Sequence, residues 1–132
     1  MLIGVPKEIK THEYRVGLTP AGVREIVSAG HSVIVQKDAG MPIGLSDDLY
    51  RKAGADIVVE GSAIFSRAEM VIKVKEPQLA ECNMLHQGQV LFTYLHLAPD
   101  PDQAKQLIKS KATCIAYETV TDNTGGLPLL AP

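Results

Sequence analysis

Two polar residues stand where long apolar runs of the sequence end. Lys75 follows residues 70–74, and His96 follows residues 90–95. If these runs are parallel strands, both residues lie beyond carboxyl ends, where open α/β sheets bind their ligands. An ammonium group can polarise a carbonyl or pair with a carboxylate, and an imidazole can pass a proton near neutral pH. Together the two residues suit carbonyl or imine chemistry.

A second lysine, Lys73, shares the run with Lys75. Strand alternation places both on one face, but Lys75 is nearer the carboxyl end, and Pro77 fixes the chain just beyond it. We therefore predict that Lys75 is the functional lysine. Spacing leaves an alternative open, in which Lys75 is a solvated strand end and His96 a loop histidine.

Arg15 follows the first apolar run of the chain, in the segment 11–16. Its guanidinium could hold a carboxylate through two parallel hydrogen bonds, which a lysine would do less well. The alternative is a surface arginine paired with Glu13 or Glu8, and spacing alone favours that alternative.

The other histidines and the cysteines predict no metal site. His12 is expected in a solvated loop and His31 at a strand entry. Cys82 and His86 are four residues apart, but two ligands do not make a zinc site, so a structural role is expected. With Cys114 as the only other cysteine, no disulfide framework is predicted.

No phosphate-binding loop is visible in the sequence. The one glycine-rich stretch, residues 38–44, matches neither G-x-G-x-x-G nor a P-loop. We therefore assign no cofactor-binding residues to this chain. A hydride-transferring enzyme needs its nicotinamide bound somewhere, so either this chain is no oxidoreductase or its cofactor site lies outside these residues.

The elements that must position these residues alternate between strands and helices. Residues 2–5, closed by Pro6, predict a buried strand, and Thr19 with Pro20 predicts a helix start. Further strands are expected at 31–36, 57–59, 70–74, 90–95 and 112–116, and helices at 20–30, 46–54, between 59 and 70, and at 99–109 with Ala104, Leu107 and Ile108 facing inward. This alternation predicts a right-handed, parallel-sheet α/β domain, a flavodoxin-like or Rossmann-like three-layer fold without its own dinucleotide fingerprint.

Length and charge narrow the class of partner. The 132 residues suit one core, and the net charge of −2 argues against a nucleic-acid partner. Charged residues among the first 20, and the lack of any apolar run of about 18, predict neither a signal peptide nor a membrane partner. We expect a soluble, cytoplasmic protein whose partner is a small molecule.

Four segments, in order, resemble the alanine dehydrogenase family. Residues 1–8 (MLIGVPKE) with 14–16 (YRV) resemble its opening, and the other motifs are 72–77 (IKVKEP), 93–98 (TYLHLA) and 116–120 (AYETV). The resemblance covers the whole chain. It separates this chain from the nearest relative of the family, the nucleotide-binding subunit of proton-translocating transhydrogenase, which lacks the histidine found at His96.

The resemblance implies reversible, NAD-dependent oxidative deamination of L-alanine to pyruvate and ammonium. Arg15 and Lys75 would then bind the substrate, Tyr94 would form a pocket wall, and His96, acting with Lys75 as a catalytic residue, would donate and accept the proton. The resemblance also implies a homo-oligomer, a hexamer, for the full-length protein.

By the same resemblance, residues 1–132 are the N-terminal portion of a substrate-binding domain. The Rossmann NAD-binding domain, a second acidic catalytic residue and a C-terminal return segment would lie beyond Pro132, with 127–132 as a linker. This chain alone is then expected to be inactive. One departure from the family pattern, residues 41–45 in a loop usually made of small residues, leaves the packing of that loop open.

Two other functions remain alternatives. One is a transhydrogenase-like N-terminal domain, which His96 and Lys75 argue against. The other is a non-catalytic binding domain, either a flavodoxin-like domain that senses a small carboxylate or a receiver domain of a signalling pair. A receiver needs acidic residues where the first strand ends, and here that strand ends in Pro6 and Lys7.

Overall fold

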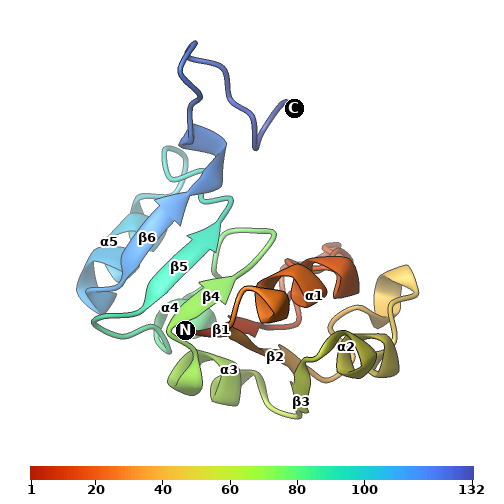
Figure 1. Cartoon of the computed structure of the whole chain (residues 1–132). Helices are drawn as coiled ribbons and strands as arrows, with labels where there is room; N and C mark the ends of the chain where they lie inside the picture. Colours follow the sequence, from red (N-terminus) through yellow and green to blue (C-terminus); the bar gives the residue numbers. More distant parts are fainter.

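Six parallel strands form one sheet in the order β3-β2-β1-β4-β5-β6 (Figure 1). The computed structural model describes residues 1–132. The order begins at a central strand and reverses between β1 and β4, as in doubly wound Rossmann sheets. The strands are β1 (Leu2–Val5), β2 (Ser32–Gln36), β3 (Asp56–Val58), β4 (Met70–Ile72), β5 (Val90–Thr93) and β6 (Thr113–Ala116).

Helices cover both faces of this sheet, so the predicted three-layer α/β fold is confirmed (Figure 1). The helices are α1 (Pro20–Ser28), α2 (Asp47–Ala53), α3 (Gly61–Arg67), α4 (Leu79–Cys82) and α5 (Pro101–Ser110), with 3-10 turns at Met41–Ile43 and Tyr117–Thr119. None of these helices has the length and apolarity that a membrane crossing requires.

Local chemistry sets the helix ends as the sequence predicted. The Thr19 and Ser46 side chains accept backbone N–H groups in the first turns of α1 and α2. Gly30 and Gly54 follow these two helices with φ of 93° and 108°, a left-handed conformation that a side chain would strain.

The core is divided by the sheet into two clusters. Val33 and Val35 of β2 join the cluster beneath α1 and α2, whereas Ile34 between them joins the cluster beneath α3 to α5. Alternate residues of a strand point to opposite faces, and both faces here are covered, which explains why the strands read as continuous apolar runs.

Several predicted boundaries were wrong. The run 70–74 leaves the sheet after Ile72, the run 90–95 leaves it after Thr93, and α4 was not predicted. Ile108 was expected to face inward but is 78% exposed. Gln103 and Leu107 form the buried stripe of α5, so Ile108 is turned about 100° away from that stripe.

The connection between β1 and α1, residues 6–19, is fixed against the rest of the domain at two points. The hydroxyl of the buried Tyr50 donates to the Leu18 carbonyl at 2.7 Å. Gly17 lies so close to the end of β4 that a Cβ there would be 2.7 Å from the Ile72 carbonyl oxygen. This connection carries Glu8, Glu13 and Arg15 and is therefore held in one place.

We expect Tyr50→Phe to lower the free energy of unfolding by about 1–3 kcal/mol, because the Leu18 carbonyl would lose its buried donor. Urea denaturation of the variant measures the loss. Tyr14→Phe is the matched control, because Tyr14 is 57% exposed, and its removal should change stability by less than about 0.5 kcal/mol. Equal losses in both variants would contradict the anchoring role of Tyr50.

Candidate functional site

Three of the residues selected from the sequence line one cavity of about 340 Å³. Arg15, Lys75 and Tyr94 meet there with Val74, Tyr117, Leu129 and Leu130. Lys75, Tyr94 and Tyr117 follow the carboxyl ends of β4, β5 and β6, and Arg15 comes from the connection after β1. Parallel strands bring these ends to one edge, next to the point where the strand order reverses.

Lys75 is held in the cavity by aromatic contacts. Its Nζ lies 4.7 Å from the centroid of the Tyr94 ring, a cation–π contact, and the side chain is half-buried. Tyr94 packs in turn against Tyr117, with ring centroids 6.3 Å apart. No carboxylate forms an ion pair with the Lys75 ammonium group. The group therefore remains able to meet an anion or a carbonyl oxygen.

Arg15 forms a two-point ion pair with Glu13. The Nε and Nη2 atoms donate to the two carboxylate oxygens at 3.0 and 2.7 Å. This is the pairing that spacing favoured, with Glu13 as the partner. The Arg15 side chain is nevertheless 63% exposed, and a guanidinium has further N–H donors that this pair does not use. The ion pair orients Arg15 at the cavity without saturating it.

The same ion pair changes the acidity of Glu13. Hydrogen bonds from Arg15 lower the pKa of the Glu13 carboxyl from 4.5 to about 2, and the contact raises the pKa of Arg15. Both groups are thus charged throughout the physiological range.

His96 lies at the rim of this site and does not line the cavity. It is exposed, and its ring stacks on Tyr94 with centroids 5.6 Å apart and an interplanar angle of 15°. Its φ of 45° is in the left-handed region, which turns the chain sharply after β5. Lys75 and His96 are thus brought together through Tyr94, which contacts both.

Lys73 is not in the cavity, and the expectation that it shares a face with Lys75 is wrong. Its ammonium is buried, 3.0 Å from Glu8 Oε2 and 3.1 Å from Glu81 Oε2. The strand ends at Ile72 and the chain bends at residues 74–75, so strand alternation no longer applies there.

The sequence reasoning missed Tyr117, Leu129 and Leu130 as lining residues. Tyr117 follows β6 as Lys75 follows β4, so the rule that selected Lys75 would have selected it as well. The leucines belong to the segment expected to be a linker, and no local pattern marks them. Met41 and Ile43, in the loop that departs from the family pattern, are exposed and do not line this cavity.

A dinucleotide does not fit the turn after β1. In Rossmann domains a short glycine-rich turn there presents N–H groups to the pyrophosphate. Here the connection runs over residues 6–19, and the buried Glu8 carboxylate lies at the β1–β4 junction. A carboxylate would repel a pyrophosphate, so the residues present do not suit that group.

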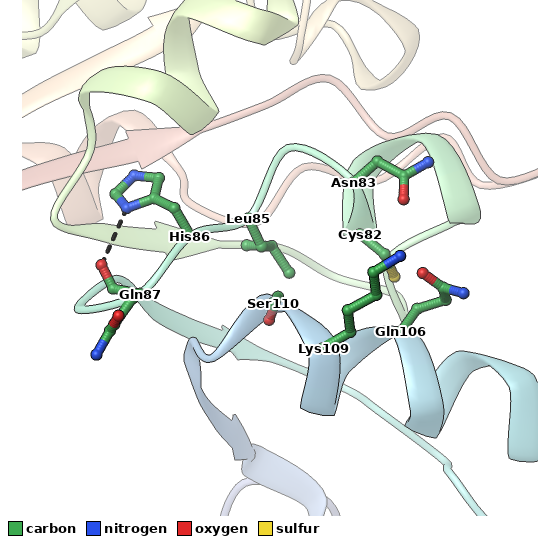
Figure 2. Close-up of a pocket in the computed structure, with 8 residues that line it drawn as sticks. All are labelled: Cys82, Asn83, Leu85, His86, Gln87, Gln106, Lys109 and Ser110. Atoms are coloured by element: carbon green, nitrogen blue, oxygen red, sulfur yellow. Dashed lines mark hydrogen bonds between the residues drawn. The ribbon is translucent and has the colours of Figure 1, made fainter.

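A second cavity, of about 320 Å³, lies between α4, the segment 83–87 that follows it, and α5 (Figure 2). It includes Cys82 and His86. Helix α4 ends at Cys82, and His86 Nδ1 lies 3.2 Å from the Gln87 carbonyl oxygen. Burial raises the pKa of the Cys82 thiol to about 11, which disfavours the thiolate that metals need. The structure has no group of three or more possible metal-ligating side chains.

The family model and the curated relatives agree on one family. The model described as "Alanine dehydrogenase/PNT, N-terminal domain" matches residues 4–132. Alanine dehydrogenases of Halomonas elongata and Methanococcus maripaludis are 56% and 53% identical over 132 residues, 100% of this chain in both cases and 36% and 35% of those relatives. The chain therefore spans little more than a third of the length of these curated relatives.

Solved structures agree with the sequence comparison. An L-alanine dehydrogenase superposes with a TM-score of 0.95 at 50% identity, over 98% of this chain and 36% of that one. A transhydrogenase from Sinorhizobium meliloti superposes with a TM-score of 0.86 at 24% identity, over 94% and 37% of the two chains. The second likeness is one of fold alone.

The Arg15–Glu13 pair predicts that the Glu13 carboxyl titrates at an unusually low pH. The folded pKa of Glu13 lies below its ordinary value, so its contribution to stability is present above pH 4.5 and is lost as the pH falls toward 2. We expect Arg15→Ala to return the midpoint of Glu13 toward 4.5, as measured by NMR of the carboxyl carbon. Arg51→Ala, which removes an exposed pair with Asp48, is the control and should leave Glu13 unchanged. A Glu13 midpoint near 4.5 in the unmodified protein would refute the assignment.

Proposed function

The chain belongs to the family of alanine dehydrogenase/PNT N-terminal domains, and from this we propose that it forms the substrate-binding part of an L-alanine dehydrogenase. The observation that carries the proposal is that Arg15, Lys75 and Tyr94 line one cavity at the carboxyl edge of the sheet. Two cations and an aromatic wall suit a small α-keto or α-amino carboxylate such as pyruvate or L-alanine.

In this proposal the cations divide the substrate between them. Arg15 presents a fork of N–H donors, which matches a carboxylate in two parallel hydrogen bonds. Lys75 offers a single compact charge, which suits the carbonyl oxygen of pyruvate and polarises it. The Tyr94 ring packs against the Lys75 ammonium group and forms the wall of the cavity between Lys75 and His96.

His96 is the proposed proton donor and acceptor. Deamination removes a hydride from Cα and a proton from the amino group to give an imine, and water then converts the imine to pyruvate and ammonium. An imidazole titrates near neutral pH, so it can take the proton in this direction and return it in the other. Its exposed position at the rim lets it exchange that proton with solvent.

The hydride acceptor is proposed to be NAD, and the residues that bind it are proposed to lie outside this chain. The turn after β1 does not suit a dinucleotide, and the curated relatives are nearly three times as long as this chain. Residues 1–132 would then form the N-terminal portion of the substrate domain in a homo-oligomer, a hexamer, and a separate domain of the whole protein would hold the cofactor.

Substitutions in the whole protein test the assigned roles. We expect Arg15→Ala to reduce kcat/KM for pyruvate by about 10- to 100-fold, mainly through KM, because a charge-assisted contact to the carboxylate is lost. His96→Asn should lower kcat by about 100- to 10,000-fold with little change in KM. Both are measured from NADH consumption with pyruvate and ammonium, with Arg51→Ala as the surface control. Unchanged kcat and KM in both variants would show that this cavity is not part of the active site.

Residues 1–132 on their own should show no turnover of L-alanine with NAD, because the turn after β1, where Rossmann domains bind the dinucleotide, does not suit it. Binding of pyruvate to residues 1–132, followed by NMR shifts, should be weak and should weaken further in Arg15→Ala. Turnover by this chain at a rate near that of the whole protein would refute the assignment of the cofactor site to other residues.

A further inference from the structure

The backbone that carries Lys75 is held by side chains and not by the sheet. Four polar backbone groups of Val74 and Lys75 each contact a side chain of another segment. The hydroxyl of Thr93 donates to the Lys75 carbonyl at 2.8 Å, and that of Tyr117 donates to the Val74 carbonyl at 3.0 Å. The position of Lys75 therefore depends on those side chains.

The two N–H groups of this segment both donate to Glu8. Lys75 donates to Oε1 at 3.0 Å, and Val74 donates to Oε2 at 3.3 Å. The Glu8 side chain is only 1% exposed, so water cannot replace these bonds. Lys10, two residues further along, pairs with Glu76 beside Lys75 and ties the same two segments together.

A buried carboxylate needs a compensating charge, and Lys73 provides it. Lys73 Nζ donates to Glu8 Oε2 at 3.0 Å and lies 3.1 Å from Glu81 at the start of α4. Burial raises the pKa of the Glu81 carboxyl, and the nearby Lys73 ammonium opposes that shift. Removing one partner of such a cluster leaves an uncompensated buried charge.

We infer that Glu8 is a positioning residue that places Lys75 in the substrate cavity by accepting its backbone N–H, with Lys73 as the buried cation that pairs with Glu8. This inference rests on the proposed function of Lys75. A carboxylate fits the role because both of its oxygens accept hydrogen bonds, and here they receive donors from Val74, Lys75 and Lys73. A glutamine would turn an NH₂ group toward one of those donors.

A double-mutant cycle in the whole protein tests the inference. With Lys75 present, Glu8→Gln should reduce kcat/KM for pyruvate by about 10- to 100-fold, since a displacement near 1 Å has such an effect. In the Lys75→Ala background the same substitution should change kcat/KM by less than about twofold, because the residue through which Glu8 acts is gone. A similar loss in both backgrounds, or no loss with Lys75 present, would overturn the inference.

A matched control separates positioning from general destabilisation. Gln89 is buried at the amino edge, where its Nε2 donates to the carbonyls of Phe65 and Ala68. Gln89→Leu should lower stability and leave kcat/KM for pyruvate unchanged in both backgrounds. If it reproduces the pattern of Glu8→Gln, the effect is one of stability and the inference fails.

If Glu8→Gln does not fold, Thr93→Val provides the same test from the other side of the segment, because it removes the hydroxyl that holds the Lys75 carbonyl. It should reduce kcat/KM only when Lys75 is present.

Amide exchange of residues 74–75 in Glu8→Asp gives an independent test by mass spectrometry. About tenfold faster exchange is expected, because the shorter side chain cannot reach the N–H groups of Val74 and Lys75. Unchanged exchange would overturn the inference. If Lys75→Ala alone leaves kcat/KM unchanged, the proposed function fails, and the exchange result still decides whether Glu8 holds this segment.

Discussion

A buried ammonium between two carboxylates joins three segments at the carboxyl edge of the sheet. Glu8 comes from the connection after β1, Lys73 from the end of β4, and Glu81 from α4. Charges of this kind are unfavourable in a protein interior unless each meets its partner with good geometry. The three segments can therefore separate only by exposing those charges together, which makes this edge a single rigid unit.

That rigid unit lies directly beneath the cavity in which the proposed function places a small carboxylate. The reversal of strand order opens a crevice between β1 and β4, and in nucleotide-binding domains a glycine turn fills it with N–H groups. Here the Glu8 carboxylate lies in that position, and the cations Arg15 and Lys75 stand further out. The same strand order thus carries the opposite charge pattern, with a carboxylate of the protein near the sheet and two cations further out.

Local patterns in the sequence were sufficient to predict the layers of the fold. Continuous apolar runs identified the strands, and capping residues such as Thr19 with glycines such as Gly30 identified helix ends, because each depends on a few neighbouring residues. Topology then placed Lys75 and His96 at one edge, and the family resemblance added Tyr94 as a pocket wall. The burial of Lys73 could not be predicted in this way, because its partner Glu8 is 65 residues away in the sequence and draws the chain out of strand alternation. Helix α4 was missed because four residues are too few to show a helical period.

The pairing of Glu8 with Lys73 also has an evolutionary consequence. An apolar residue at position 73 leaves Glu8 and Glu81 buried without a cation, and an apolar residue at position 8 removes the acceptor of the Val74 and Lys75 N–H groups. Replacing both residues leaves Glu81 without its ammonium and those N–H groups without an acceptor, so neither position can change without loss. The placement of Lys75 is thereby protected from gradual change by residues that do not touch the cavity.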